Sequence, residues 1–268
     1  MTSAASPMKP RRRSALETQG AVIGALIMRE LHTRFGRENI GYLWVFAEPM
    51  ILATAVAAIH ARAGGHNTGP MQPVPFALIG YTVFILFRSV VLRAEGALEA
   101  NRPLLYHRMV TVSDMLIARA LLEGASTVMA LTLMIGGAVV LGLADPPARP
   151  LALLAAMILV LWFAFGLSAL VCAGSYFSRA AGRLLHPVIY LALPLSGAFF
   201  MVKWIPQPFR DMVAWIPLTQ MFELVRYGQF GAADLAYVNF PYIVGWCLAL
   251  SFVGLLSLSV VRPRLHLD

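Results

Sequence analysis

The chain has 268 residues, of which 59% are hydrophobic and only 13% are charged. Soluble domains carry roughly 45–50% apolar and about 25% charged residues, so this composition excludes an ordinary soluble domain and indicates an integral membrane protein. The net charge of +8 is typical of basic loops that face anionic head groups, and we expect no nucleic-acid partner.

Six apolar segments are long enough to span a bilayer as helices, and their length argues against the short alternating strands of a barrel. They cover residues 41–61, 75–92, 115–143, 151–172, 184–202 and 241–261. The fifth is the least regular, because it holds His186, Pro187 and Pro194. The sequence predicts an all-α polytopic membrane protein with a single six-helix transmembrane domain over residues 41–261.

Lysine and arginine are unevenly distributed between the two sides of these spans. With the N-terminus inside, the inner side holds seven in residues 1–41, three in 93–108, two in 179–183 and two in 262–264, against five on the outer side. The positive-inside rule therefore predicts that the tails, residues 1–40 and 262–268, are both cytoplasmic.

Residues 16–35 have the spacing of an amphipathic helix. Ile23, Ile27, Leu31 and Phe35 recur at steps of four, and the charged residues between them keep the segment out of the hydrocarbon. This pattern predicts a helix that lies in the inner membrane interface. The alternative is a cytoplasmic helix packed on a partner.

Residues 202–240 precede the last span and mix aromatic residues with prolines and charges. Trp204, Trp215, Phe222 and Tyr227 are spread along this stretch, and Trp and Tyr favour membrane interfaces. We expect short amphipathic, re-entrant helices in the outer leaflet, with a structured outer loop as the alternative.

No motif for catalysis or nucleotide binding occurs in the chain. Lys9 and Lys203 are its only lysines and neither follows a glycine-rich turn, so a phosphate-binding loop is absent. The six histidines are scattered, and Cys172 and Cys247 fall inside predicted spans, so we expect no metal site and no disulfide. If the protein moves a solute uphill, the energy must come from a partner or from an ion gradient.

Residues 93–114, RAEGALEANRPLLYHRMVTVSD, form a polar island between two long apolar stretches. Leu104, Leu105 and Tyr106 form an apolar cluster within it. Such a cluster favours a segment that docks to a soluble partner over the alternative, a solvated loop. The candidate docking residues are Asn101, Arg102, Pro103, Leu104, Leu105, Tyr106, His107 and Arg108. Arg179 and Arg183, between the fourth and fifth spans, are a second candidate contact.

Arg119 and Glu123 are charges inside the third span, four residues apart on one helix face. Such spacing allows an ion pair that lowers the cost of charge in lipid. We therefore expect Arg119 and Glu123 to form a structural ion pair within the helix, with a direct role in substrate transport as the alternative.

Aromatic and charged side chains in the first two spans are candidates for the wall of a channel through which sugars pass. Aromatic rings suit the apolar faces of sugars, and arginine suits their carboxylates or phosphates. Ordinary packing is the alternative. The candidates are Tyr42, Trp44, Phe46 and Glu48 in the first span, and Tyr81, Phe84 and Arg88, which share one face of the second.

Six short segments stand out along the chain: RELHTRFG at 29–36, IGYLW at 40–44, EP at 48–49, LEAN at 98–101, IARALLE at 117–123 and IPLTQMFELVR at 216–226. In collinear order over residues 21–261, they resemble the membrane (permease) subunits of ABC-2-type transporters that export capsular polysaccharide. This resemblance implies a non-enzymatic homodimeric subunit of the bacterial inner membrane that binds two cytoplasmic ATPase subunits. The island would be the family's coupling helix.

The resemblance also implies the cargo and the remaining partners. The cargo would be a lipid-linked polysaccharide, handed on to periplasmic and outer-membrane export proteins, and ATP and Mg²⁺ would bind to the ATPase and not to this chain. Three alternatives stay open: a related permease for O-antigen, teichoic acid or another lipid-linked glycan, a gradient-driven secondary transporter that relays protons, and a structural membrane scaffold.

Overall fold

The computed structural model describes residues 14–35, 50–51, 54–55, 58, 71–101 and 110–261. Helices joined by turns make up these ranges, and no strand occurs within them. The all-α fold class predicted from the sequence is confirmed for this part of the chain.

Four helices in the described ranges are long and apolar enough to cross a membrane: α3 (Pro73–Leu92), α6 (Val112–Val140), α7 (Pro150–Phe177) and α11 (Phe240–Val261). At about 1.5 Å per residue each extends at least about 30 Å, which matches the hydrocarbon core of a bilayer. Each coincides closely with a predicted span. Proline stands at the start of α3 and α7, where its missing N–H costs no helical hydrogen bond.

The fifth predicted span is a shorter helix, α8 (Arg179–Leu195), which contains Pro187 and Pro194. Its 17 residues extend about 26 Å, slightly less than the hydrocarbon thickness. The first predicted span, residues 41–61, lies largely outside the described residues. The count of six spans therefore stays a prediction.

Helix α7 lies at the centre of the bundle, in contact with α3, α6, α8, α10 and α11. Its closest neighbour is α11, because Gly166 and Gly254 face one another across the contact. A Cβ added at Gly254 would lie 2.8 Å from the Gly166 carbonyl oxygen. The two backbones therefore pack closely, in the way that small residues allow in membrane helix pairs.

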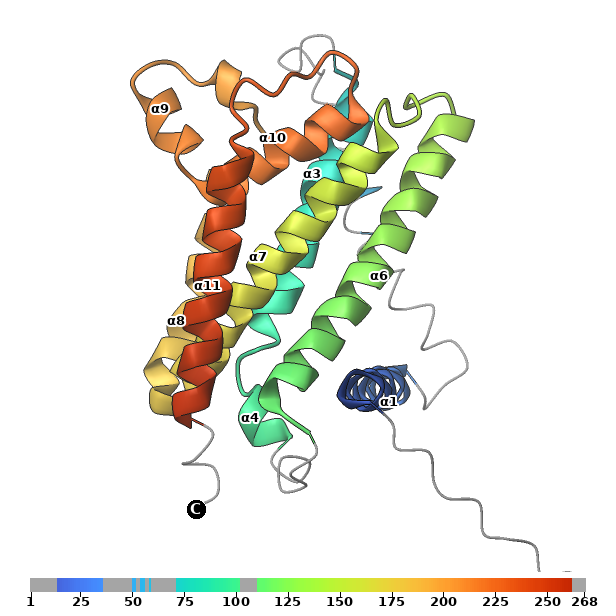
Figure 1. The fold of residues 1–268 in the computed structure, drawn as a ribbon. Helices are drawn as coiled ribbons and strands as arrows, with labels where there is room; N and C mark the ends of the chain where they lie inside the picture. Colours follow the sequence, from blue (N-terminus) through green and yellow to red (C-terminus); the bar gives the residue numbers. More distant parts are fainter. Residues whose placement is uncertain are drawn as a thin grey trace, which may run out of the picture.

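Three short helices occupy most of residues 202–240: η1 (Val202–Trp204), α9 (Phe209–Ala214) and α10 (Pro217–Gln229). Figure 1 shows α9 and α10 lying across one end of the long helices. Helix α10 is buried along nearly its whole length, whereas Phe209, Met212 and Trp215 are exposed on and beside α9. The predicted short helices are present, and their depth in a membrane stays a prediction.

Helix α1 (Ala15–Phe35) matches the predicted N-terminal amphipathic helix. It begins with a capping box, in which Glu17 N–H donates to Ser14 Oγ and Ser14 N–H donates to Glu17 Oε2. Figure 1 shows α1 end-on, crossing the direction of the long helices beside the N-terminal end of α6. The short helix α4 (Ala97–Ala100) and the last residues of α11 lie at this same end of the bundle, opposite α10.

Candidate functional site

The candidate site is the end of the bundle where α1, α4 and α6 meet. Of the predicted docking residues, Asn101 and Arg183 are described in full. Arg179 is the first residue of α8, and nothing is described of its side chain. Residues 102–108 lie outside the described residues, as do Tyr42, Trp44, Phe46 and Glu48.

The first part of the polar island is folded onto the ends of the spans. Helix α3 ends at Leu92, a turn follows, and α4 brings the chain to Asn101. Ala94, Ala97 and Leu98 are buried in an apolar cluster with residues of α6, α7 and α11. This part of the island is therefore fixed to the spans by packing, and it is not a solvated loop.

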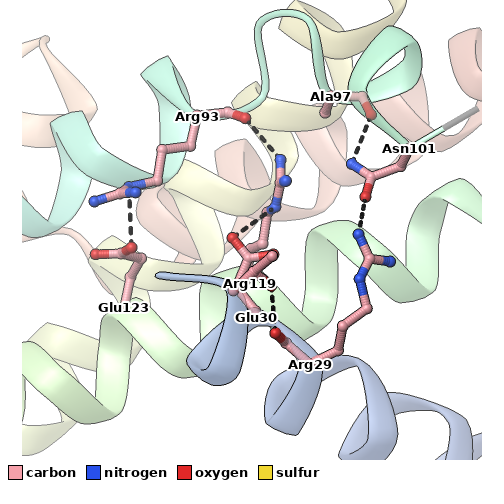
Figure 2. Close-up of polar contacts among 8 residues, drawn as sticks. Arg29, Glu30, Arg93, Ala97, Asn101, Arg119 and Glu123 are labelled. Carbon is pink, nitrogen blue, oxygen red and sulfur yellow. Dashed lines mark hydrogen bonds and ion pairs between the residues drawn. The ribbon is translucent and has the colours of Figure 1, made fainter. Parts of the chain in front are cut away.

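Asn101 connects the island to α1. Its side chain is buried, with 4% of the residue exposed. Asn101 Nδ2 donates to the Ala97 carbonyl at 2.9 Å, and Asn101 Oδ1 accepts from Arg29 Nη2 at 2.7 Å. Figure 2 shows this chain of bonds from α4 to α1. Because both the nitrogen and the oxygen of the amide are hydrogen-bonded, its orientation is fixed. The bond to α1 is charge-assisted, since its donor is the Arg29 guanidinium, and such hydrogen bonds are stronger than those between neutral groups.

Arg119 and Glu123 do not form with one another the ion pair that the sequence predicts. Arg119 Nε lies 3.4 Å from Glu30 Oε1 of α1, and Arg93 Nε at the end of α3 lies 3.0 Å from Glu123 Oε1. Arg119 Nη1 also donates to the Arg93 carbonyl at 3.0 Å. The physical reason is that an arginine one turn before a glutamate is the less favourable order for a pair within a helix, and opposite charges from α1 and α3 lie close by.

These contacts join three segments of the chain (Figure 2). Arg93 is held to α6 twice, through its side chain and through its carbonyl, while α1 is held to α6 by Glu30. A second contact between α1 and α6 lies further along, where Gln19 Nε2 donates to Asp114 Oδ1 at 3.2 Å. Helix α1 is thus attached to α6 at two points, Gln19 and Glu30, which lie about 17 Å apart along the axis of α1.

The start of α8 also reaches the island. His186 Nδ1 lies 3.3 Å from Glu95 Oε2 in the turn after α3. Gly182 allows this approach, because a Cβ added there would lie 2.5 Å from Glu95 Oε1. The structure therefore places the turn after α3 against the start of α8, and Arg183 is exposed beside the contact.

The channel candidates on α3 have different surroundings. Phe84 is 2% exposed and packs on Phe87 in the core, so it is not available to a polysaccharide that passes along the surface of this chain. Tyr81 stacks on Phe199 with ring centroids 6.3 Å apart. Arg88 Nη2 donates to Tyr190 Oη at 2.8 Å, and its guanidinium lies 4.6 Å from the centre of the same ring. A role in lining a channel stays a prediction for Tyr81 and Arg88.

A buried ion pair on α10 was not predicted from the sequence. Arg226 Nη1 lies 3.3 Å from Glu223 Oε1, and both side chains are 3% exposed. Arg226 also donates to the Gly197 carbonyl, and Glu223 Oε1 accepts from the Val202 N–H at 2.9 Å. Burial raises the pKa of the Glu223 carboxyl, and the Arg226 guanidinium and the Val202 N–H act against that rise. The spacing of three residues was the available signal.

The structure gives no sign of a metal centre in the described part of the chain, where no three His, Cys, Asp or Glu side chains converge. The described site is instead a polar junction at one end of an apolar bundle. These features define the chain as a polytopic membrane protein with a junction of charged side chains where its spans meet the polar island.

The chain belongs to the ABC-2 type transporter family, whose model matches residues 21–230. It is 37% identical to the capsule polysaccharide export inner-membrane protein CtrC of Neisseria meningitidis serogroup A, over 90% of this chain and 91% of that protein. It is 34% identical to the capsule polysaccharide export inner-membrane protein BexB of Haemophilus influenzae, over 92% of this chain and 93% of that protein. It is 30% identical to the polysialic acid transport protein KpsM of Escherichia coli, over 91% and 94%.

These similarities confirm the family that the sequence motifs indicate. Together with the four apolar helices, they also confirm the predicted location, the bacterial inner membrane.

Proposed function

We propose that this chain is the membrane subunit of an ATP-driven exporter that moves lipid-linked capsular polysaccharide across the inner membrane. The observation that carries the proposal is the similarity over at least 90% of the chain to proteins named for export of capsule polysaccharide or transport of polysialic acid. The chain acts as a homodimer with two cytoplasmic ATPase subunits, which bind ATP and Mg²⁺. Periplasmic and outer-membrane export proteins receive the polysaccharide.

In this proposal the end of the bundle that carries α1 and α4 faces the cytoplasm. Two observations support that orientation. Lysine and arginine are concentrated in the segments assigned to this side, and α1, α4 and the last residues of α11 lie at one end of the bundle (Figure 1). Helix α1 then lies at the inner interface, with Arg29 and Glu30 turned toward α4 and α6.

The ATPase docks on residues 101–108 and on the start of α8, and the polar junction transmits its movement. Asn101 is bonded to α1, Arg93 is bonded to α6, and Glu95 is bonded to α8. A displacement of the island therefore acts on three helices at once. Contiguous polar contacts between rigid helices are the physical means by which such coupling travels.

Asn101→Ala tests the coupling role, in the complex purified with its ATPase and in cells. It removes both bonds of the amide and leaves the packing of Ala97 and Leu98 in place. We expect normal membrane abundance and continued ATP hydrolysis with reduced polysaccharide on the cell surface. Glu99→Gln, at an exposed position of α4, is the matched control and should change neither activity. Normal export in the Asn101→Ala variant would refute the coupling role.

The cargo is tested separately, in cells from which this chain is deleted. We expect loss of capsular polysaccharide from the surface, its accumulation inside the cell, and recovery of both when the chain is restored. An intact capsule with loss of another surface glycan would show that the cargo is different.

A further inference from the structure

Helices α6 and α7 enclose an apolar groove at the end of the bundle near α10. The groove has a volume of about 490 Å³, within the range of about 300–1,000 Å³ that is usual for ligand sites. Prolines of the connection between the two helices close one end of it. Its walls include Leu131, Ile135 and Val139 of α6, Leu153 and Met157 of α7, and Pro147.

The groove lies further along α6 than a point of close contact with α7. A Cβ added at Gly124 of α6 would lie 2.7 Å from Leu161 Cδ2 of α7. About three turns further along α6, a Cβ added at Gly136 would meet nothing within 4 Å. Gly136 lines the groove, and open space lies where its Cβ would be.

The lining of the groove suits only an apolar ligand. It contains no charged residue, and its one hydroxyl, that of Thr132, donates to the Val128 carbonyl at 2.8 Å. Water in this groove would find too few polar partners to remain there. Both walls belong to helices that can span a membrane, so the surroundings of the groove are hydrocarbon.

We propose that this groove is a binding site for one acyl chain of a membrane phospholipid. In a bilayer there is no hydrophobic gain from leaving lipid, so the preference comes from dispersion contacts. A chain in the groove contacts α6 on one side and α7 on the other, whereas a chain on an exposed helix face contacts one surface only. The phospholipid head group lies at the level of residues 141–149, where the two helices are connected.

The lipid has a structural role at this site. Leu131, Ile135, Leu153 and Met157 are buried in the core of the bundle, so without an occupant only the surfaces that face the groove lose dispersion contacts. The acyl chain completes the packing of the two helices. In the orientation proposed above, the site lies in the outer leaflet.

Photolabelling tests the site directly. The full chain in its complex is placed in vesicles of phosphatidylethanolamine and phosphatidylglycerol that contain a phospholipid with a photoreactive group in the middle of one acyl chain. We expect label on the groove residues of α6 and α7 at severalfold the level found on the exposed face of α11, around Phe252 and Leu256. Because this measurement uses the wild-type chain, it stands whether or not a variant folds.

Two neighbouring glycines give a matched pair of variants. Gly136→Phe places a ring in the groove, whereas Gly137→Phe adds the same ring next to it, at a position with open space that does not line the groove. We expect Gly136→Phe to lower the labelling of the groove to the level of α11, and Gly137→Phe to leave it unchanged. Added phospholipid should also raise the melting temperature of the lipid-depleted wild type more than that of Gly136→Phe.

Three results would overturn the proposal. Label on α11 without label in the groove would show that protein covers it, either residues 36–70 of this chain or a second copy. Labelling that appears only with the lipid-linked glycan present would assign the groove to the lipid of the cargo. Equal labelling of the groove and of α11 would show that the groove has no preference for an acyl chain.

Discussion

Glu30→Gln breaks the ion pair that attaches α1 to α6 while it keeps the size of the side chain. In the native chain Glu30 Oε1 lies 3.4 Å from Arg119 Nε, and the two side chains are 16% and 18% exposed. The substitution leaves Arg119 with its bond to the Arg93 carbonyl but weakens the contact that opposes its charge. We therefore expect a lower stability of the folded chain, with the loss concentrated at the α1–α6 contact.

The expected size of the effect follows from the burial of the pair. Exposed ion pairs contribute about 0–1 kcal/mol, whereas removal of one partner from a buried pair costs about 3–5 kcal/mol. This pair lies between the two limits, so we expect a coupling energy of about 1–2 kcal/mol between Glu30 and Arg119. For a chain of this size, that corresponds to a fall of about 2–8 °C in melting temperature.

The two cysteines provide the assay. Cys172 and Cys247 are free and buried, so a dye that becomes fluorescent on reaction with thiols reports unfolding of the spans. Melting temperatures of Glu30→Gln, Arg119→Met and the double variant give a double-mutant cycle, and Glu99→Gln is the control for loss of an exposed carboxylate. Strictly additive effects, or a Glu30→Gln shift no larger than that of Glu99→Gln, would refute the reasoning.

Three further outcomes are expected. Replacement of Leu104, Leu105 and Tyr106 by serine should stop export while ATP hydrolysis continues, measured as surface polysaccharide against phosphate release; unchanged export would remove the docking role of these residues. Arg88→Ala should reduce export without reducing the amount of the chain in membranes, and a normal capsule would leave Arg88 with its structural contact to Tyr190 alone. Gly228→Ala should lower membrane abundance, because the added Cβ would lie 2.5 Å from the Leu153 nitrogen and overpacking of this kind costs about 1–3 kcal/mol; Gly231→Ala, where a Cβ meets nothing within 4 Å, should accumulate normally.

The long helices could be predicted because hydrocarbon requires long apolar segments, and α3, α6, α7 and α11 meet that requirement by composition alone. Helix α1 could be predicted because one of its faces is apolar. Partly buried positions do recur on that face, at residues 22–23, 26–27 and 29–31. The sequence did not indicate that Arg29 and Glu30 lie on the buried side, since a charge is normally expected on the polar face of such a helix.

The partners of the charged residues could not be predicted from local spacing. Arg119 and Glu123 have the separation of a helical pair, yet they bind Glu30 and Arg93, which precede them by far more than one helical turn. Such partners depend on how segments distant in sequence pack together. The Glu223–Arg226 pair shows the converse case, because its spacing was visible, but its burial depends on the contacts of α10 with α3 and with residues 197–202.

The two attachments of α1 to α6 can form only after α6 has been synthesised. Gln19 and its partner Asp114 are separated by 95 residues, and at about 5–20 residues per second the ribosome needs about 5–20 s to produce the second after the first. During that interval α1 has left the ribosome while α6 is still incomplete, and an amphipathic helix can wait at the membrane surface. The same apolar face thus binds the newly made helix to the membrane surface and later packs against α6 in the folded protein.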